Sequence, residues 1–189
     1  MTPPRLKVCG INNAAFAAAA EERGADYLGF IFAEGSPRRV TPVQAEAIAA
    51  RLKGASRRVG VFVRETPDEI ACIVRQARLD VVQLHRRASA DDVATLRAAG
   101  YEVWTLAGGA PGDAVLFDSS HGDGETALRR GPWRTVLAGG ISAENVHRAV
   151  ALQPDVIDVS GSLETAPGHK DVVLLDRFIF AFRRAAGVV

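Results

Sequence analysis

The sequence predicts an α/β protein, a single-domain (β/α)8 TIM barrel that spans residues 1–189 and is compact, with its fifth helix missing or reduced to a loop. Two observations support this fold class. Eight short apolar runs alternate with helix-prone stretches along the chain, which is typical of parallel strands joined by right-handed crossovers. Several runs also end in a small or chemically active residue, and barrels of this kind carry their function at the carboxyl ends of the strands.

The predicted strands are short and mostly apolar. Residues 6–9 end in a lone cysteine that a glycine follows at once. Residues 26–32 are apolar nearly throughout, as expected of a parallel strand that is covered on both faces. The eight predicted strands are residues 6–9, 26–32, 59–63, 81–85, 102–106, 114–118, 134–138 and 155–159.

Capping residues mark the predicted helices between the strands. Residues 14–23 are rich in alanine and precede Gly24, a common stop at a helix C-terminus. Thr41 and Thr66 are each followed by proline, which is favourable at the first helical position. The predicted helices are residues 14–23, 42–53, 67–77, 90–99, 143–150 and 171–186, with Ser89 and Ser142 as further N-caps.

One helix of the alternation is missing from the pattern. Residues 108–112, Gly-Gly-Ala-Pro-Gly, are too short and too broken to form a helix after the fifth strand. A typical barrel of this kind has about 250 residues, so a chain of 189 residues needs short loops and the loss of a helix. An open doubly wound sheet is the alternative fold that the same alternation allows.

Composition excludes several classes of protein. With 48% hydrophobic residues and 23 Lys and Arg against 22 Asp and Glu, the chain can bury a core and has a net charge of +1, which argues against binding to nucleic acid or to an anionic membrane. It has no apolar stretch of about 18 residues and no secretory signal pattern. Its two cysteines form no metal or redox motif, so we expect no metal, no cofactor and a cytoplasmic location.

Four sites lie at the predicted strand ends. Cys9 and Asp118 end the first and sixth strands, and Gly139-Gly140 and Ser160-Gly161 follow the seventh and eighth. Taken singly, each has an ordinary explanation as a core cysteine, a helix cap or a tight turn. Taken together, they indicate a phosphate site in the last two loops and, on the opposite side of the same mouth, a cysteine–carboxylate pair for proton transfer.

Motifs along nearly the whole chain resemble those of phosphoribosylanthranilate isomerase, a family of tryptophan biosynthesis. Residues 7–11, Lys-Val-Cys-Gly-Ile, resemble the opening motif of that family, and further motifs follow in the same order. These are residues 24–26, 29–32, 36–38, 59–63, 82–85, 137–141, 144–146, 158–160, 164, 167–168 and 170–171.

The resemblance implies a (β/α)8 barrel that catalyses an Amadori rearrangement of N-(5-phosphoribosyl)anthranilate. Asp118 would be the general acid that opens the furanose ring, and Cys9 the general base that removes the C2 proton. Arg38 would bind the anthranilate carboxylate, and Gly139, Gly140, Ser160 and Gly161 the phosphate. A raised pKa of the carboxyl group and a lowered pKa of the thiol would suit these roles at neutral pH.

The chain departs from the family pattern in three places. His121–Glu125 replaces a glycine-rich stretch, Ser160-Gly161-Ser162 stands where Ser-Ser-Gly is usual, and Arg86 replaces a glycine. Asp123 and Glu125 add carboxylates that would repel an anionic substrate, so we expect weaker substrate binding than a typical member shows.

The expected partner is a small phosphorylated substrate, and the chain would act as a monomer or homodimer. Two other functions remain open from the sequence. One is another sugar-phosphate isomerase or epimerase, which a histidine or a pair of aspartates as acid and base would favour. The other is a catalytically silent barrel that binds phosphate.

Overall fold

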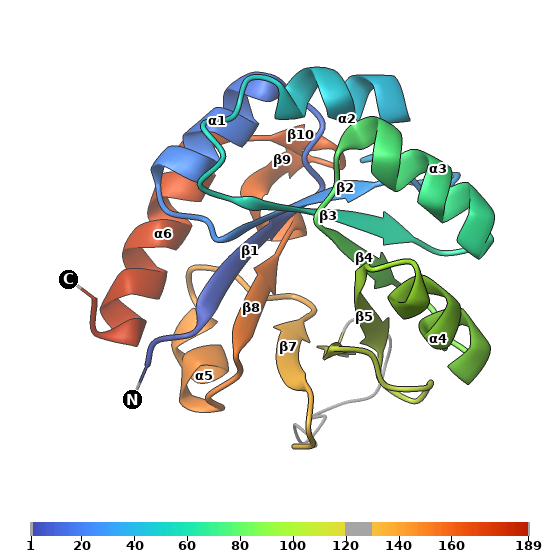
Figure 1. Cartoon of the computed structure of the whole chain (residues 1–189). Coiled ribbons are helices and arrows are strands. Elements are labelled where there is room, and N and C mark those ends of the chain that lie inside the picture. Colours follow the sequence, from blue (N-terminus) through green and yellow to red (C-terminus); the bar gives the residue numbers. More distant parts are fainter. Residues whose placement is uncertain (1, 120–129, 189) are drawn as a thin grey trace.

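The computed structural model describes residues 2–119 and 130–188, which form a closed barrel of parallel strands surrounded by helices (Figure 1). The barrel order follows the chain from β1 to β8, and β1 pairs with both β2 and β8. The predicted TIM barrel is therefore confirmed, and an open sheet is excluded. The strands are β1 Arg5–Cys9, β2 Tyr27–Ile31, β3 Arg57–Phe62, β4 Val81–Leu84, β5 Glu102–Leu106, β6 Ala114–Asp118, β7 Arg134–Ala138 and β8 Val156–Val159.

The helices cover the outside of the barrel. They are α1 Ala14–Glu22, α2 Pro42–Ala49, α3 Pro67–Ala77, α4 Ala90–Ala98, α5 Val146–Ala151 and α6 Val172–Ala186. Threonine or serine caps α2, α3 and α4 as predicted, each with a reciprocal capping box. Within the described residues, no helix is both long enough and apolar enough to cross a membrane.

The connection from β5 to β6 contains no helix, as the sequence predicts. This connection instead packs closely against the segment between β4 and α4. A Cβ on Gly109 would lie only 2.6 Å from the backbone nitrogen of Ala88 in that segment. The Gly112 amide donates to the Thr105 hydroxyl at 3.0 Å, which holds the loop to β5. A helix does not fit in so close a path.

Two predicted helix boundaries are wrong. Helix α2 ends at Ala49 and not near Lys53, because the Glu21 carboxylate accepts hydrogen bonds from the amides of Lys53, Ala55 and Ser56 and draws the chain toward β3. Ser142 does not cap α5. Its amide donates to the side chain of Asn145 at 2.8 Å, so the chain makes a turn first and the helix begins at Val146.

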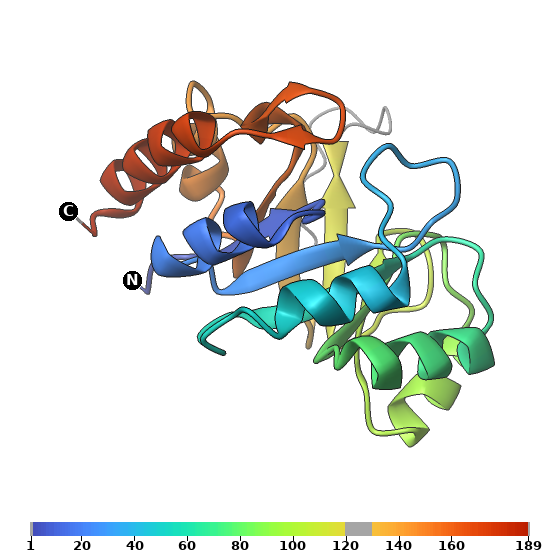
Figure 2. The same cartoon turned by 90° about the horizontal axis from the view of Figure 1, so that it is seen from above.

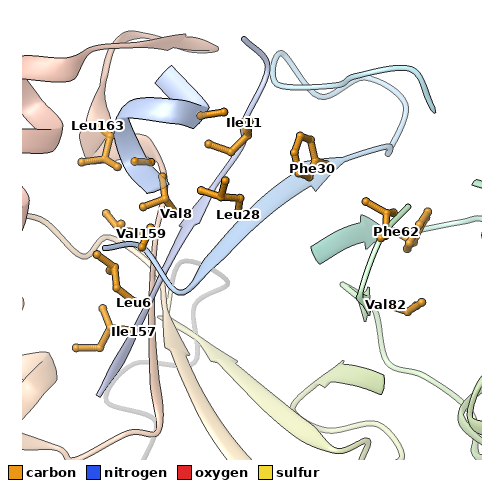
Figure 3. Packing of buried hydrophobic residues seen from close by; sticks show 14 of the residues in the cluster. Leu6, Val8, Ile11, Leu28, Phe30, Phe62, Val82, Ile157, Val159 and Leu163 are labelled. Atoms are coloured by element: carbon orange, nitrogen blue, oxygen red, sulfur yellow. The ribbon is translucent and has the colours of Figure 1, made fainter. Parts of the chain in front are cut away.

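Side chains alternate between two hydrophobic clusters, because successive residues of a strand face opposite sides. Figure 3 shows the outer side, where Leu6 and Val8 of β1 lie beside Ile157 and Val159 of β8. The cluster inside the barrel contains Tyr27, Val59, Val81, Trp104, Ala114, Leu116, Val136, Ala138 and Val156. In β1 the alternation places Lys7 and Cys9 on the inner side, the opposite face to Leu6 and Val8.

A small hairpin after β8 is absent from the sequence-based prediction. It consists of the 3-10 turn η2 Gly161–Leu163 and the antiparallel strands β9 Glu164–Ala166 and β10 His169–Lys170. In Figure 2 this hairpin lies at the end of the barrel toward which β2 points, as does the loop after β2. The hairpin therefore lies at the mouth where the predicted site residues are expected.

Candidate active site

Cys9 is the last residue of β1, and it is 7% exposed at the top of the barrel interior. Gly29 lies beside it on β2, where a Cβ would stand 2.7 Å from the Cys9 Sγ. Glycine at this position therefore leaves the space that the thiol occupies.

A buried ion pair lies one layer below Cys9. Lys7 is 0% exposed, and its Nζ lies 2.6 Å from Oδ2 of Asp158 on the adjoining strand β8. Burial alone would lower the pKa of Lys7, but the charges of Asp158 and of Cys9 outweigh it and raise that pKa. Lys7 therefore remains an ammonium group inside the barrel.

Burial raises the pKa of the Cys9 thiol, so the expected lowering is wrong. Removing the thiol from water disfavours the thiolate more than the neighbouring cations favour it. Those cations are Lys7 and Lys170, and both act to lower the pKa, while Asp158 acts with burial to raise it.

Asp118 is the last residue of β6, at the same end of the barrel as Cys9. Its Oδ2 lies 3.7 Å from Nε2 of His85, which follows β4. Gly139 packs closely against the carboxylate, since a Cβ there would lie 2.6 Å from Asp118 Oδ1. The charges of both Asp118 and His85 act on Asp158, so the two sides of the mouth are electrostatically connected through β8.

Arg38, in the loop after β2, forms a bidentate ion pair with Glu164 of β9. Its Nε and Nη2 lie 2.7 Å from the two carboxylate oxygens. The buried Lys170 of β10 shares the same carboxylate at 2.8 Å. Burial opposes ionisation of Glu164, but these two cations outweigh it and lower its pKa. Glu164 thus fixes two cations at the mouth.

The same network reaches the end of β1 through Ser160. Lys170 Nζ donates to the Ser160 carbonyl at 3.0 Å, and the Ser160 hydroxyl donates to the Cys9 carbonyl at 3.1 Å. Gly10 lies between these side chains, where a Cβ would stand 2.7 Å from Cδ of Arg38. Arg38, Ser160 and Cys9 therefore belong to one connected cluster.

The expected placement of Cys9 and Asp118 opposite the last two loops is wrong, because β1 closes against β8 and β6 pairs with β7, which brings Cys9 beside Ser160 and Asp118 beside Gly139.

The predicted phosphate residues lie in the loops after β7 and β8. Gly139 and Gly140 both have positive φ angles, +93° and +64°, which favour glycine. The Ser162 hydroxyl donates to the Ile141 carbonyl at 2.7 Å and joins this loop to the turn that begins at Gly161. The structure brings the loops together at the mouth, and the binding role of their residues stays a prediction.

The expectation for His121–Glu125 lies outside the described residues, and the roles of Asp123 and Glu125 remain predictions from the sequence.

Sequence reasoning assigned no role to five charged or titratable residues of the site, which are Lys7, His85, Asp158, Glu164 and Lys170. The sequence does contain a signal for Lys7 and Asp158, because each is a charged residue within an otherwise apolar strand. Their contact joins residues 151 positions apart, however, and only the closure of β1 against β8 reveals it.

Comparison with known proteins agrees with this geometry. The family model of N-(5'-phosphoribosyl)anthranilate (PRA) isomerase matches residues 6–181. The N-(5'-phosphoribosyl)anthranilate isomerase of Geobacter sulfurreducens is 37% identical over 207 residues, which cover 97% of this chain and 98% of that protein. The match therefore extends over the whole barrel, site residues included.

Solved structures of phosphoribosylanthranilate isomerases are similar to the barrel. One, of monomers generated from the dimeric phosphoribosylanthranilate isomerase of Thermotoga maritima, has a TM-score of 0.84 and 33% identity, covering 95% of this chain and 98% of that one. Another phosphoribosylanthranilate isomerase, in complex with reduced 1-(o-carboxyphenylamino)-1-deoxyribulose 5-phosphate, has a TM-score of 0.82 and 32% identity, covering 97% and 99%. On its sequence and its structure, the chain belongs to the phosphoribosylanthranilate isomerase family.

Proposed function

We propose that the site converts N-(5'-phosphoribosyl)anthranilate into 1-(2-carboxyphenylamino)-1-deoxyribulose 5-phosphate, an Amadori rearrangement in tryptophan biosynthesis. The observation that supports this most strongly is the placement of a thiol and a carboxyl group, Cys9 and Asp118, at the carboxyl ends of β1 and β6 of one closed barrel. Membership in the family supports the same reaction.

The first chemical step needs a proton donor. The carboxyl group of Asp118 gives its proton to the furanose ring oxygen while the C1–O bond breaks. The nitrogen lone pair forms the C1=N bond of a Schiff base, and the ring oxygen becomes a hydroxyl group. This assigns Asp118 the role of general acid.

The second step needs a base. The thiolate of Cys9 removes the proton at C2, the electrons of the C–H bond form the C1=C2 bond, and the C=N electrons return to nitrogen. The resulting enolamine tautomerises to the ketone product. This assigns Cys9 the role of general base, which requires the thiolate although burial raises the pKa of the thiol.

The ends of the substrate would be bound on either side of these groups. Arg38 has its Nε and Nη2 on Glu164, so the remaining edge of the guanidinium is the one that would meet the anthranilate carboxylate. Backbone N–H groups of Gly139, Gly140 and Gly161, with Ser160, would hold the phosphate.

A pair of aspartates as acid and base would instead favour another sugar-phosphate isomerase. The charge of Asp118 does act on Asp158, but Oδ2 of Asp158 is bound to Lys7 in the layer below Cys9. That ion pair favours a supporting role for Asp158 and leaves Cys9 as the base.

We further propose that the reaction takes place in the cytoplasm and that the chain acts as a monomer or homodimer. Both cysteines are free thiols, which is consistent with a reducing compartment. Sedimentation of the purified protein measures the oligomeric state.

Complementation tests the function. Expression of this chain should restore growth without tryptophan to a bacterium that lacks its phosphoribosylanthranilate isomerase, and the purified protein should consume the fluorescent substrate. If a soluble, folded protein achieved neither, the proposed reaction would be wrong.

A further inference from the structure

We propose that Lys7, anchored by Asp158, is a positioning residue that sets the ionisation of the Cys9 thiol. This inference rests on the proposed role of Cys9 as the base. Lys7 and Cys9 are two residues apart on β1, so their side chains face the same side of the strand, toward the barrel interior. The pair has no other assigned role in the reaction.

The geometry directs the Lys7 charge at the thiol. The ammonium group is fully buried and bound to Asp158 at 2.6 Å, and it lies on the same face of β1 as the buried thiol, two residues away. In a water-excluded site, a nearby cation strongly favours the ionised form of its neighbour, and the charges of Lys7 and Cys9 favour one another's ionised forms. Asp158 uses only one oxygen in this pair, and its buried Oδ1 has no hydrogen-bond partner among the described residues.

Other charged groups act on Cys9 from above. Lys170 of β10 lowers the pKa of the thiol, and the charge of Cys9 acts in turn on Arg38. Glu164 binds both of these cations. The charged groups around Cys9 are therefore three cations (Lys7, Arg38 and Lys170) and two carboxylates (Asp158 and Glu164). The negative charge of a Cys9 thiolate makes this cluster electrically neutral.

Groups on the far side of the mouth act on Asp158. His85 favours the charged form of Asp158, and Asp118 disfavours it. In the proposed reaction Asp118 has given up its proton before the thiolate is needed, so its carboxylate then disfavours the charge of Asp158, which is the charge that opposes the thiolate. Lys7 therefore remains the principal cation acting on the thiol from within the barrel.

The experiment measures the pKa of Cys9 without substrate. Iodoacetamide reacts with the thiolate, so the rate of alkylation against pH reports the ionisation of the thiol. The protein carries Cys72→Ser, which removes the exposed second cysteine on α3 and leaves Cys9 as the only target.

Two substitutions in the pair should move this pKa in opposite directions. Lys7→Met should raise it by about one unit or more, the usual scale for a charge at close range. Asp158→Asn should lower it, because the carboxylate opposes ionisation of the thiol. The control Lys53→Met removes the same charge from an exposed ion pair with Glu22 and should leave the pKa of Cys9 unchanged. If Lys7 and Asp158 only supported the fold, the two substitutions would not shift the pKa of Cys9 in opposite directions.

The inference is wrong if folded Lys7→Met shows the same alkylation profile as Lys53→Met. If Lys7→Met does not fold, the test rests on Asp158→Asn. A pKa of Cys9 that is unchanged or raised in that variant overturns the proposal. Because alkylation needs no substrate, a protein without isomerase activity that still shows both shifts would contradict the proposed function and not this inference.

Discussion

Gly139 and Asp118 are in such close contact that a side chain on the first would displace the second. A Cβ built on Gly139 would stand 2.6 Å from Asp118 Oδ1 and 2.5 Å from the backbone nitrogen of Ser119. The close approach follows from the pairing of β6 with β7, in which Asp118 lies opposite Ala138. A glycine that the sequence indicates as a phosphate-binding residue therefore also shapes the position of the proposed acid.

The first prediction tests this contact with Gly139→Ala. We expect kcat to fall by at least about tenfold, because moving a catalytic group by a fraction of an ångström impairs proton transfer. The control is Gly54→Ala, which has a comparable positive φ of +84° but no atom within 4 Å of its Cβ. Both variants carry backbone strain of about 1–2 kcal/mol. Thermal unfolding measures this strain in each variant, and steady-state kinetics measures the additional effect of displacing Asp118. Equal kcat in the two variants would contradict the prediction.

Asp118→Asn should block ring opening, because the amide keeps the shape of the side chain and has no acidic proton to give. Stopped-flow fluorescence should show loss of substrate consumption by about two orders of magnitude or more. Rapid consumption by this variant would mean that another group supplies the proton.

Cys9→Ala should block the later step and leave ring opening intact. We expect kcat to fall by about two orders of magnitude or more, while the Schiff base still forms and can be trapped by cyanoborohydride as a species two hydrogens heavier. Cys72→Ser is the matched control, since that thiol is exposed on α3. If Cys9→Ala turned over at a near-normal rate, Cys9 would not be the base.

Most features that depend on neighbouring residues could be predicted from the sequence, and the cap expected at Ser142 is the exception. Thr41 and Thr66 begin helices as expected, and each caps its helix through a residue three positions further on. The end of α2 depends instead on Glu21, whose carboxylate binds amides more than 30 residues away, and a local pattern does not contain that contact.

The same distinction between local and long-range features applies to the site residues. Cys9 and Asp118 could be placed at strand ends from the order of apolar runs alone. The raised pKa of Cys9 could not be predicted, because it reflects burial of the thiol inside the closed barrel. Glu164 illustrates the same limit, since it contacts Arg38 across 126 positions.

Arg38→Lys should raise KM for the substrate while kcat changes less. A lysine can place one ammonium group near Glu164 or near the anthranilate carboxylate, but it cannot present two edges as the guanidinium does. We expect a rise of about tenfold, the scale of one charge-assisted hydrogen bond. The control Arg97→Lys changes an arginine whose ion pair with Asp113 lies on the surface. An unchanged KM in Arg38→Lys would mean that the substrate carboxylate binds elsewhere.

The last prediction concerns Arg86, which stands where the family usually has glycine, and its partner Asp92 at the start of α4. Arg86 Nη1 lies 2.7 Å from Asp92 Oδ2, and the Ser89 hydroxyl donates to the same oxygen at 2.8 Å. The ion pair with Arg86 and the hydrogen bonds from Ser89 lower the pKa of Asp92 to about 2. Because the pKa in the folded protein is below the usual value of about 3.9, the carboxylate stabilises the fold above about pH 4. That contribution is lost as the pH falls toward 2.

Asp92→Asn should therefore reduce the free energy of unfolding at pH 6 by about 1 kcal/mol, the scale of a capping interaction, and the difference from wild type should shrink toward pH 2.5. Asp91→Asn is the control, since it removes the same charge from the same first turn of α4. Urea unfolding at both pH values, followed by circular dichroism, measures the two differences. If both variants lose the same stability at both pH values, the effect is that of charge near the helix terminus, and the contact of Asp92 with Arg86 and Ser89 adds nothing to the fold.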